Sequence, residues 1–459
     1  MMIERDKTYK YETHCHTTPV SLSAKASQED TVMFYKKIRM VLVCFVAGIL
    51  VWMLTGFTYS NGNRSELSQP DTAVQNVKNN LRIAVASDLH LDPDNTDKSL
   101  DSETVYSSEL VDALLWDALQ QGAEMILLTG DLVNGGKLHR HEALTEKLRQ
   151  AEADGVQVYV LPGNHDLAPI TQTEFAELYA EFGYNEAYSR DLSSLSYCLM
   201  RDDLLLLMMD TAGYSAGAID LPDAQKREDN EPFFSESTLR WAEECMKTAQ
   251  EKHLPILAAG HFNFLPDISK QPGSGYCVEN GDRFADLLRR YNAPLYLSGH
   301  MHIRGVYQEN GLTELMTEYL LNYPTGYSIL DLCEDRLCYT PRRIHVDAWA
   351  QETGVTDPVL LNFADWQQEA LFRYSVSNVG YMCERNPLAD EEQRDAIGFF
   401  YTVMNSFWDG TLSEKREAIK RMPGYDPFFR CAEGYAYGWW LNELIETSSP
   451  LLKGFELRF

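Results

Sequence analysis

The chain has few positive charges relative to its negative ones. Its 459 residues contain 40 Lys and Arg against 68 Asp and Glu, which gives a formal net charge of -28 at pH 7. So negative a protein repels duplex nucleic acid and anionic lipid unless a local basic patch overrides the field, and no such patch occurs outside the short basic run before residue 40. We therefore expect no duplex nucleic-acid partner, and an anionic substrate would have to be held by local positive charge.

The cysteines also lack any spacing typical of a zinc module. Nine are present, and none forms a CxxC arrangement. Cys333 and Cys338 flank a short polar turn in a predicted hairpin, so a cross-strand disulfide in an oxidising compartment and a pair of free thiols both stay open. Internal repeats and low-complexity tracts are absent, and the chain is long enough for two or three folded units.

A long uncharged stretch stands near the N-terminus. Residues 40–59 carry no charged side chain and follow Lys36, Lys37 and Arg39. About 20 apolar residues are enough to cross a bilayer. Because the preceding 39 residues exceed the usual leader of a signal peptide, we predict an uncleaved single-pass anchor in the cell membrane. The positive flank places a tail, 1–39, in the cytoplasm and the rest outside it; a cleaved signal and a secreted protein are the alternative.

The remaining chain divides by its periodicity. Residues 60–79 are polar and predict a linker, and 80–350 alternate short apolar runs with helix-like stretches, which predicts an α/β catalytic domain. Residues 351–459 show helical periodicity and predict a small all-α C-terminal domain, whose many aromatic side chains we interpret as helix packing, with substrate stacking as the alternative. The predicted strands are 83–86, 125–129, 156–161, 204–209, 254–259, 294–298, 303–308, 314–318, 326–332 and 336–341, and the predicted helices are 104–121, 141–154, 236–252, 359–377, 389–407, 412–421 and 429–446.

Five polar motifs each follow an apolar run of strand length. In an open α/β sheet, ligands bind at the carboxyl ends of the strands, so these motifs are expected to converge. Any one of the residues is ordinarily explained as a cap, a turn residue or a core histidine, but five such motifs in succession are not. The motifs are SDLH (Asp88, His90), TGDLVNGG (Asp131), PGNHD (Asn164, His165, Asp166), AGHFN (His261) and SGHMH (His300, His302).

Apart from His165 and Asp166, the motif residues supply two carboxylates, one amide and four imidazoles. Divalent ions bind all three kinds of group, and the set is the right size for two metals. Asp131 enters alone from a glycine-rich turn, so its two oxygens make it the expected shared ligand of two ions about 3.5 to 4 Å apart. Ligand type does not identify the metals, because such mixed sites accept Mn, Fe, Zn or Co.

These motifs, in this order over about residues 81–303, resemble those of the calcineurin-like metallophosphoesterases. The resemblance implies a four-layer α/β/β/α sandwich, a small phosphoester substrate and two divalent or trivalent metal ions. It implies that His165 is the catalytic histidine and not a ligand. It implies one metal held by Asp88, His90, Asp131 and His302, and the other held by Asp131, Asn164, His261 and His300.

The stretch from GDLVNGG to PGNHD is also similar to bacterial cyclic-nucleotide phosphodiesterase-like members that carry a helical C-terminal domain. Such relatives often have a second histidine after the His261 position, where this chain has Phe262 and then Asn263. A phosphodiester, with cyclic nucleotides among the candidates, is the expected substrate. The alternative is a phosphomonoesterase or nucleotidase at the cell surface. A non-catalytic scaffold would be expected to lack ligands, and none is missing here.

The expected mechanism uses two cations to lower the pKa of a bridging water, so that hydroxide attacks in line. His165 then stabilises or protonates the leaving oxygen. Asp166 either orients His165 or serves the turn. His139 and His141 are expected to support the site or begin a helix, and Arg140 is a candidate for substrate contact. The sequence leaves the physiological substrate and the oligomeric state open.

Overall fold

The structure, a computed structural model, describes residues 81–97, 104–201, 204–225, 231–265, 277–333 and 336–458. The predicted cytoplasmic tail, anchor (40–59) and linker lie outside these residues. Within the described ranges, no helix combines the length and the apolar character needed to cross a membrane.

The first sheet has six strands, in the order β13-β12-β11-β1-β2-β3. β1, β2 and β3 are parallel to one another, and β1 pairs with β11 in the antiparallel sense. β1 and β2 are almost wholly buried, as their apolar sequences LRIAVA and MILLT require when both faces of a sheet are covered. The strands are β1 (Leu81–Ala86), β2 (Met125–Thr129), β3 (Gln157–Leu161), β11 (Gly326–Cys333), β12 (Arg336–Arg343) and β13 (Phe455–Arg458).

The second sheet has seven strands, in the order β4-β5-β6-β7-β8-β10-β9. Its centre, β6, β7, β8 and β10, is parallel, and β9 closes the edge as an antiparallel hairpin with β10. The strands are β4 (Ser189–Arg190), β5 (Tyr197–Met200), β6 (Leu205–Met208), β7 (Ile256–Ala259), β8 (Leu295–Ser298), β9 (Gly305–Glu309) and β10 (Leu312–Met316).

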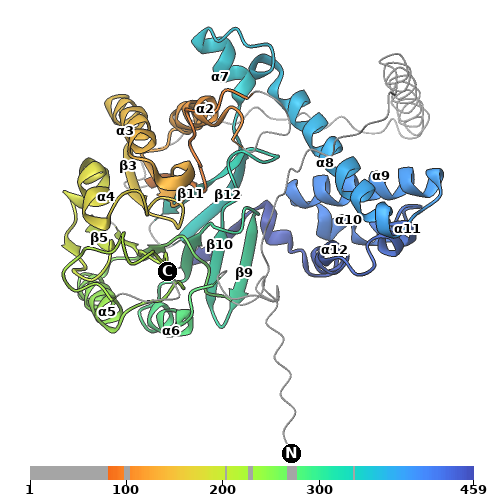
Figure 1. The fold of residues 1–459 in the computed structure, drawn as a ribbon. Coiled ribbons are helices and arrows are strands. Elements are labelled where there is room, and N and C mark those ends of the chain that lie inside the picture. Colours follow the sequence, from red (N-terminus) through yellow and green to blue (C-terminus); the bar gives the residue numbers. More distant parts are fainter. Residues whose placement is uncertain are drawn as a thin grey trace, which may run out of the picture. The chain divides into compact units, whose positions relative to one another are not determined.

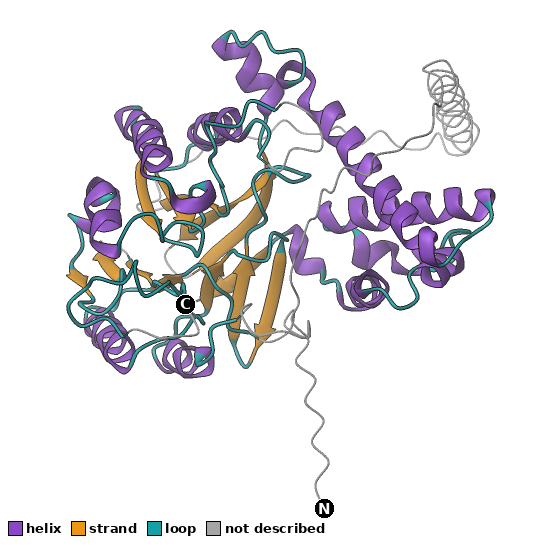
Figure 2. Ribbon diagram, viewed as in Figure 1, coloured by secondary structure: helices purple, strands orange, loops and turns teal. Residues whose placement is uncertain are grey.

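Helices of the α/β part surround these strands (Figures 1 and 2). Side-chain caps begin two of these helices: the Thr171 side chain accepts from the Glu174 backbone N–H ahead of α4, and the Ser235 side chain accepts from the Thr238 backbone N–H ahead of α5. The helices are α2 (Ser107–Gln120), η1 (Asn134–Gly136), α3 (Leu138–Ala153), α4 (Gln172–Leu178), η2 (Ala180–Tyr184), α5 (Glu236–Glu251) and α6 (Gly281–Arg290).

The C-terminal region is helical and has an aromatic core. Phe399, Phe400 and Phe428 are fully buried, and the Phe428 ring centroid lies 5.4 Å from that of Phe399 and 5.5 Å from that of Phe400. These aromatic residues therefore pack the helices, as expected, while Trp439 is 42% exposed. The elements are α7 (Val346–Thr353), η3 (Leu360–Asn362), α8 (Phe363–Arg385), α9 (Asp390–Trp408), α10 (Leu412–Ile419), α11 (Tyr425–Cys431), α12 (Ala436–Thr447) and η4 (Pro450–Lys453).

The predicted strands all occur within a few residues of their expected bounds, and the α/β class with a helical C-terminal region is confirmed. The elements β4, β5, α4, α6 and α7 were not predicted, and α8 extends past residue 377 to Arg385. Two further features of the C-terminal region differ. The predicted helix 429–446 is broken near Gly434, whose φ of 79° is left-handed. β13 was missed because four residues give no readable period, yet it pairs with β12 and returns the chain to the first sheet. Of the two states left open for Cys333 and Cys338, the structure has free thiols, which stand opposite Arg336 and Asp331 rather than each other.

Truncation of the aromatic core should destabilise the protein. We expect Phe428→Ala to lower the free energy of unfolding by about 3 to 5 kcal/mol, because it leaves a cavity between Phe399 and Phe400. Urea denaturation followed by circular dichroism measures this. Tyr381→Ala, at a side chain that is 59% exposed, is the control and should change stability by less than about 1 kcal/mol. Equal losses in the two variants would contradict the packing.

Candidate metal centre

The structure brings six of the seven predicted ligands into two adjoining groups. In each group, the potential ligand atoms lie within 4.8 Å of one another, and Asp131 belongs to both. Asn164, the predicted amide ligand, follows β3 directly after Gly163, and Gly163 lies against Asp131. The groups are Asp88, His90, Asp131 and His302, and Asp131, His261 and His300.

The two sheets contribute different ligands. Asp88 and Asp131 follow β1 and β2 of the first sheet, whereas His261 and His300 follow β7 and β8 of the second. A hydrogen-bond contact joins the two sheets here: His261 Nδ1 lies 2.9 Å from the Thr129 carbonyl oxygen at the end of β2. The carboxyl ends of both sets of parallel strands thus meet at one site, as the motif positions predicted.

Five of the candidate ligands have a left-handed backbone. The φ angles are 52° at Asp88, 40° at His90, 49° at Asp131, 67° at His300 and 58° at His302. This conformation is costly for residues with a Cβ and is concentrated at functional sites. The surrounding structure must hold these five residues in place, and their concentration in one cluster supports a functional site there.

Two glycines let the turns approach each other. A Cβ on Gly163 would collide with the backbone N and Oδ1 of Asp131, and one on Gly299 would collide with the Ser87 hydroxyl and lie 2.6 Å from Asp88 Oδ2. Only glycine allows this proximity. Close packing thus explains why glycine precedes Asn164 and His300.

Several buried polar atoms of the cluster have no hydrogen-bond partner. They are Asp88 Oδ1, His90 Nε2, Asn164 Oδ1 and His261 Nε2. Burial of an unpaired polar atom is costly, so such atoms are rare unless an ion or a ligand pairs with them. The residues present therefore fit two metal ions. Asn164, which belongs to neither of the two groups of carboxylates and imidazoles, also has an unpaired oxygen available as a ligand.

Burial and the neighbouring carboxylates shift the pKa values of the ligand imidazoles in different directions. Burial lowers the pKa of His90 and of His300 to about 4, so both are neutral at pH 7. Burial also lowers the pKa of His261, but the Asp131 carboxylate, 3.3 Å from its Nε2, outweighs this and raises the pKa to about 9. Hydrogen bonding of Nδ1 to the Thr129 carbonyl leaves Nε2 facing Asp131, where a cation would compete with the proton.

Aromatic rings pack on two of the histidines. Tyr319 stacks on His302 with ring centroids 4.4 Å apart and also meets the His90 ring edge-on at 5.1 Å. The Phe262 ring packs on that of His300, with ring centroids 3.9 Å apart. The sequence analysis did not single out Tyr319 as a site residue; the only signal for it was its position three residues after β10.

His165 lies at the exposed side of the cluster. Its backbone N–H donates to Asp131 Oδ1 at 2.8 Å, and its ring centroid is 4.9 Å from that of His90. Asp166 is fully buried and accepts from three backbone N–H groups, those of Leu132, Val133 and Gly163. Of the two roles considered for Asp166, the structure thus supports the one in the turn.

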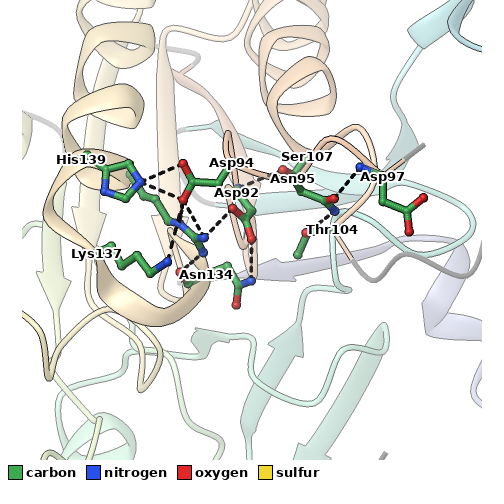
Figure 3. Close-up of polar contacts among 10 residues, drawn as sticks. Asp92, Asp94, Asn95, Asp97, Thr104, Ser107, Asn134, Lys137 and His139 are labelled. Atoms are coloured by element: carbon green, nitrogen blue, oxygen red, sulfur yellow. Dashed lines mark hydrogen bonds and ion pairs between the residues drawn. The ribbon is translucent and has the colours of Figure 1, made fainter. Parts of the chain in front are cut away.

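The three residues at the start of α3 have different surroundings. His139 is half-exposed, and its Nε2 lies 2.9 Å from Asp94 Oδ2. Figure 3 shows this contact. His141 is buried, with Nδ1 at 2.8 Å from the Tyr179 hydroxyl and Nε2 at 3.0 Å from the Asp166 carbonyl. Arg140 is 6% exposed and binds Asp92 and Asp94. Its guanidinium is therefore not free for substrate, contrary to the expectation from sequence.

Comparisons with known proteins agree with this geometry. Residues 81–304 match the model of the family described as calcineurin-like phosphoesterase, and residues 345–446 match the C-terminal domain of cyclic nucleotide phosphodiesterase. The chain is similar to a probable glycerophosphodiester phosphodiesterase GpdQ of Arcobacter nitrofigilis, with 24% identity over 244 residues, covering 52% of this chain and 78% of the relative.

Two solved structures are also similar. A dimetal phosphatase from Danio rerio has a TM-score of 0.45 and 13% identity, over 57% of this chain and 96% of that one. The purple acid phosphatase PPD1 from yellow lupin, Lupinus luteus, has a TM-score of 0.41 and 14% identity, over 58% of this chain and 52% of that one. The chain thus spans about half the length of the lupin enzyme.

Loss of the Tyr319 ring should loosen the His302 imidazole. We expect Tyr319→Leu to lower the affinity for Mn²⁺ by about 10- to 100-fold, as replacement of residues that orient metal ligands does. Tyr319→Phe keeps the stacked ring and should bind Mn²⁺ like the unmodified protein. Titration with Mn²⁺ followed by electron paramagnetic resonance measures both. The same loss in the two variants would mean that stacking does not position His302.

His141 should make stability depend on pH. Burial lowers the pKa of His141 to about 4, whereas an unfolded histidine titrates near pH 6.5. The unfolded chain therefore takes up a proton that the folded protein does not, and stability present above pH 6.5 is lost as the pH falls towards 4. At about 1.4 kcal/mol per pKa unit, the loss approaches about 3 kcal/mol.

His141→Gln keeps a donor and an acceptor for Asp166 and Tyr179 but does not titrate. We expect its unfolding free energy to fall less between pH 7 and pH 4.5 than that of the unmodified protein, measured by urea denaturation at each pH. His253→Asn, at an exposed histidine with a left-handed φ that Asn tolerates, is the control. Parallel curves for His141→Gln and the unmodified protein would refute the assignment.

Proposed function

Because this chain carries a calcineurin-like phosphoesterase domain and is a phosphoester hydrolase, we propose that it hydrolyses phosphodiesters at a two-metal centre. The observation that carries the proposal is the pair of ligand groups that share the buried Asp131 carboxylate. One metal is assigned to Asp88, His90, Asp131 and His302, and the other to Asp131, Asn164, His261 and His300.

When bound, two ions of the Mn, Fe, Zn or Co class supply positive charge to phosphoryl oxygens and Lewis acidity towards water. The side chains do the rest. Asp131 fixes the separation of the two ligand groups, and the neutral imidazoles of His90 and His300 offer lone pairs without adding charge. We propose water as the attacking nucleophile: a P–O bond to water forms as the bond to the leaving alcohol breaks.

His165 is proposed as the proton donor to that leaving oxygen. It is exposed, so a substrate can reach it, and its backbone hydrogen bond to Asp131 fixes its position relative to the ligands. Imidazole is the side chain that most often transfers a proton in catalysis. Its ring lies beside His90, which places it at the edge of the first ligand group.

A diester substrate is supported by two findings. Residues 345–446 match a domain described from cyclic nucleotide phosphodiesterase, and the curated relative is named a probable glycerophosphodiester phosphodiesterase. We infer that the substrate is a small phosphodiester, with a cyclic nucleotide as one candidate.

We also propose that residues 40–59 anchor the protein in the cell membrane with the catalytic part outside the cytoplasm. The support is the uncharged stretch and the basic residues before it. Immunoblotting of membrane and soluble fractions with a C-terminal tag tests this. A shortened, soluble product would indicate a cleaved signal instead.

The substrate class can be tested with two chromogenic esters. We expect the full-length protein, purified in detergent with added Mn²⁺, to turn over bis-p-nitrophenyl phosphate with a higher kcat/KM than p-nitrophenyl phosphate. Asp131→Asn weakens the shared ligand and should remove nearly all turnover of both, which excludes a contaminating phosphatase. Preference for the monoester would replace the proposal with the phosphomonoesterase alternative.

A further inference from the structure

The turns that follow β1 and β2 lie side by side and carry three ligands of the first metal group. Their backbones pair as a short parallel extension of the two strands, which includes an isolated bridge between Leu91 and Val133. The relative position of Asp88, His90 and Asp131 therefore depends on this pairing. The backbone hydrogen bonds are Asp88 N to Gly130 O (3.0 Å), His90 N to Asp131 O (3.0 Å), Leu91 N to Leu132 O (3.1 Å) and Asn134 N to Leu91 O (3.1 Å).

One side chain binds both turns at the end of this pairing. Arg140 Nη2 lies 2.7 Å from Asp92 Oδ1, and Nε donates to Asp94 Oδ2 at 3.0 Å; both carboxylates belong to the first turn. Arg140 Nη1 donates to the Asn134 carbonyl of the second turn at 2.6 Å. Asn134 Nδ2 in turn donates to Asp92 Oδ2 at 3.0 Å, and Figure 3 shows Asp92, Asp94 and Asn134 together.

The ion pair between Arg140 and Asp92 is buried, so water cannot replace the contacts that either side chain would lose if its partner were removed. The exposed fraction of the Arg140 side chain is 8%, and that of Asp92 is 10%. Removing one partner of a buried ion pair leaves an uncompensated charge. Asp92 stands two residues after His90, and Asn134 stands three residues after Asp131. A shift of the backbone at Asp92 or Asn134 would therefore displace the neighbouring ligand.

We propose that Arg140 is a positioning residue of the metal centre: it holds the turn of Asp88 and His90 in register with the turn of Asp131. The inference rests on the proposed two-metal function and adds a residue that acts without touching metal or substrate. Each of its three guanidinium nitrogens is engaged by Asp92, Asp94 or Asn134. A planar guanidinium presents N–H donors from three separate nitrogens in a rigid fork, whereas the three donors of a lysine ammonium sit on one nitrogen and rotate freely.

The effect should fall more on the first metal group than on the second. Asp131 is tied to the Asn164 turn separately, through the Asp166 carboxylate and its bonds to Leu132, Val133 and Gly163. His261 is fixed from β2 through the Thr129 carbonyl. Neither of these links passes through Arg140.

The test compares Arg140→Met and Arg140→Lys in the full-length protein, with Arg149→Met as the matched control. Arg149 lies on the same helix, α3, and makes exposed ion pairs with Glu181 and Glu146. Mn²⁺ is the probe, and its two affinities are measured by equilibrium dialysis and electron paramagnetic resonance.

We expect Arg140→Met to weaken one of the two Mn²⁺ affinities by about 10- to 100-fold and to leave the other near its original value. At limiting Mn²⁺, kcat for the diester should fall while KM stays unchanged. Arg140→Lys should fall between, and Arg149→Met should match the unmodified protein. Asp94→Asn, which weakens a half-exposed contact without burying a charge, should show a smaller loss in the same direction and serves if Arg140→Met does not fold.

Unchanged Mn²⁺ affinities in a folded Arg140→Met variant, with only a lower melting temperature, would show a purely structural role and overturn the proposal. A rise in KM with both affinities intact would make Arg140 a substrate contact, which also overturns it. A monoester preference of the unmodified protein would sink the proposed function but leave the Mn²⁺ result standing, so the two failures are distinguishable.

Discussion

The constraint on which the rest of the structure depends is the burial of the Asp131 carboxylate between two sheets. It is 1% exposed, and its Oδ2 lies 3.5 Å from His90 Nε2 and 3.3 Å from His261 Nε2. Burial of an anion is costly unless opposite charge or hydrogen bonds surround it. The first sheet supplies His90 and the backbone N–H of His165, and the second supplies His261. Both sheets must therefore end at this carboxylate.

The two sheets meet at Asp131 through turns with a strained backbone, and the residues around these turns must hold that conformation. Five candidate ligands have left-handed φ angles. Side chains that are not ligands link the turns after β1, β2 and β3, which are the first, second and third turns. Arg140 joins the first and second turns, and the Asp166 carboxylate joins the second and third. Strain of this kind persists only where the structure around it over-determines the conformation. The geometry of the site thus depends on the residues that link these turns as well as on the ligands themselves.

The helical region is connected to the same network. Arg304, two residues after His302, forms a buried ion pair with Glu318, next to Tyr319, and donates to the Trp408 carbonyl at the end of α9. The Tyr323 hydroxyl donates to Asn405 of the same helix at 2.6 Å. The segment that places the Tyr319 ring on His302 is therefore bound from the helical side. This gives the C-terminal helices a structural part in the site that does not require contact with substrate.

The sequence by itself determined the α/β class, the helical C-terminal region and the residues that could bind metal. These follow from local information: apolar periods of strand or helix length, and polar motifs at the ends of the strands. Tertiary structure decided the roles of Tyr319, Arg140 and Asp166, and the return of β13 to the first sheet. The reason is that each depends on partners distant in the chain, such as Arg140 on Asp92 and Asp94, or β13 on β12, which no local pattern encodes.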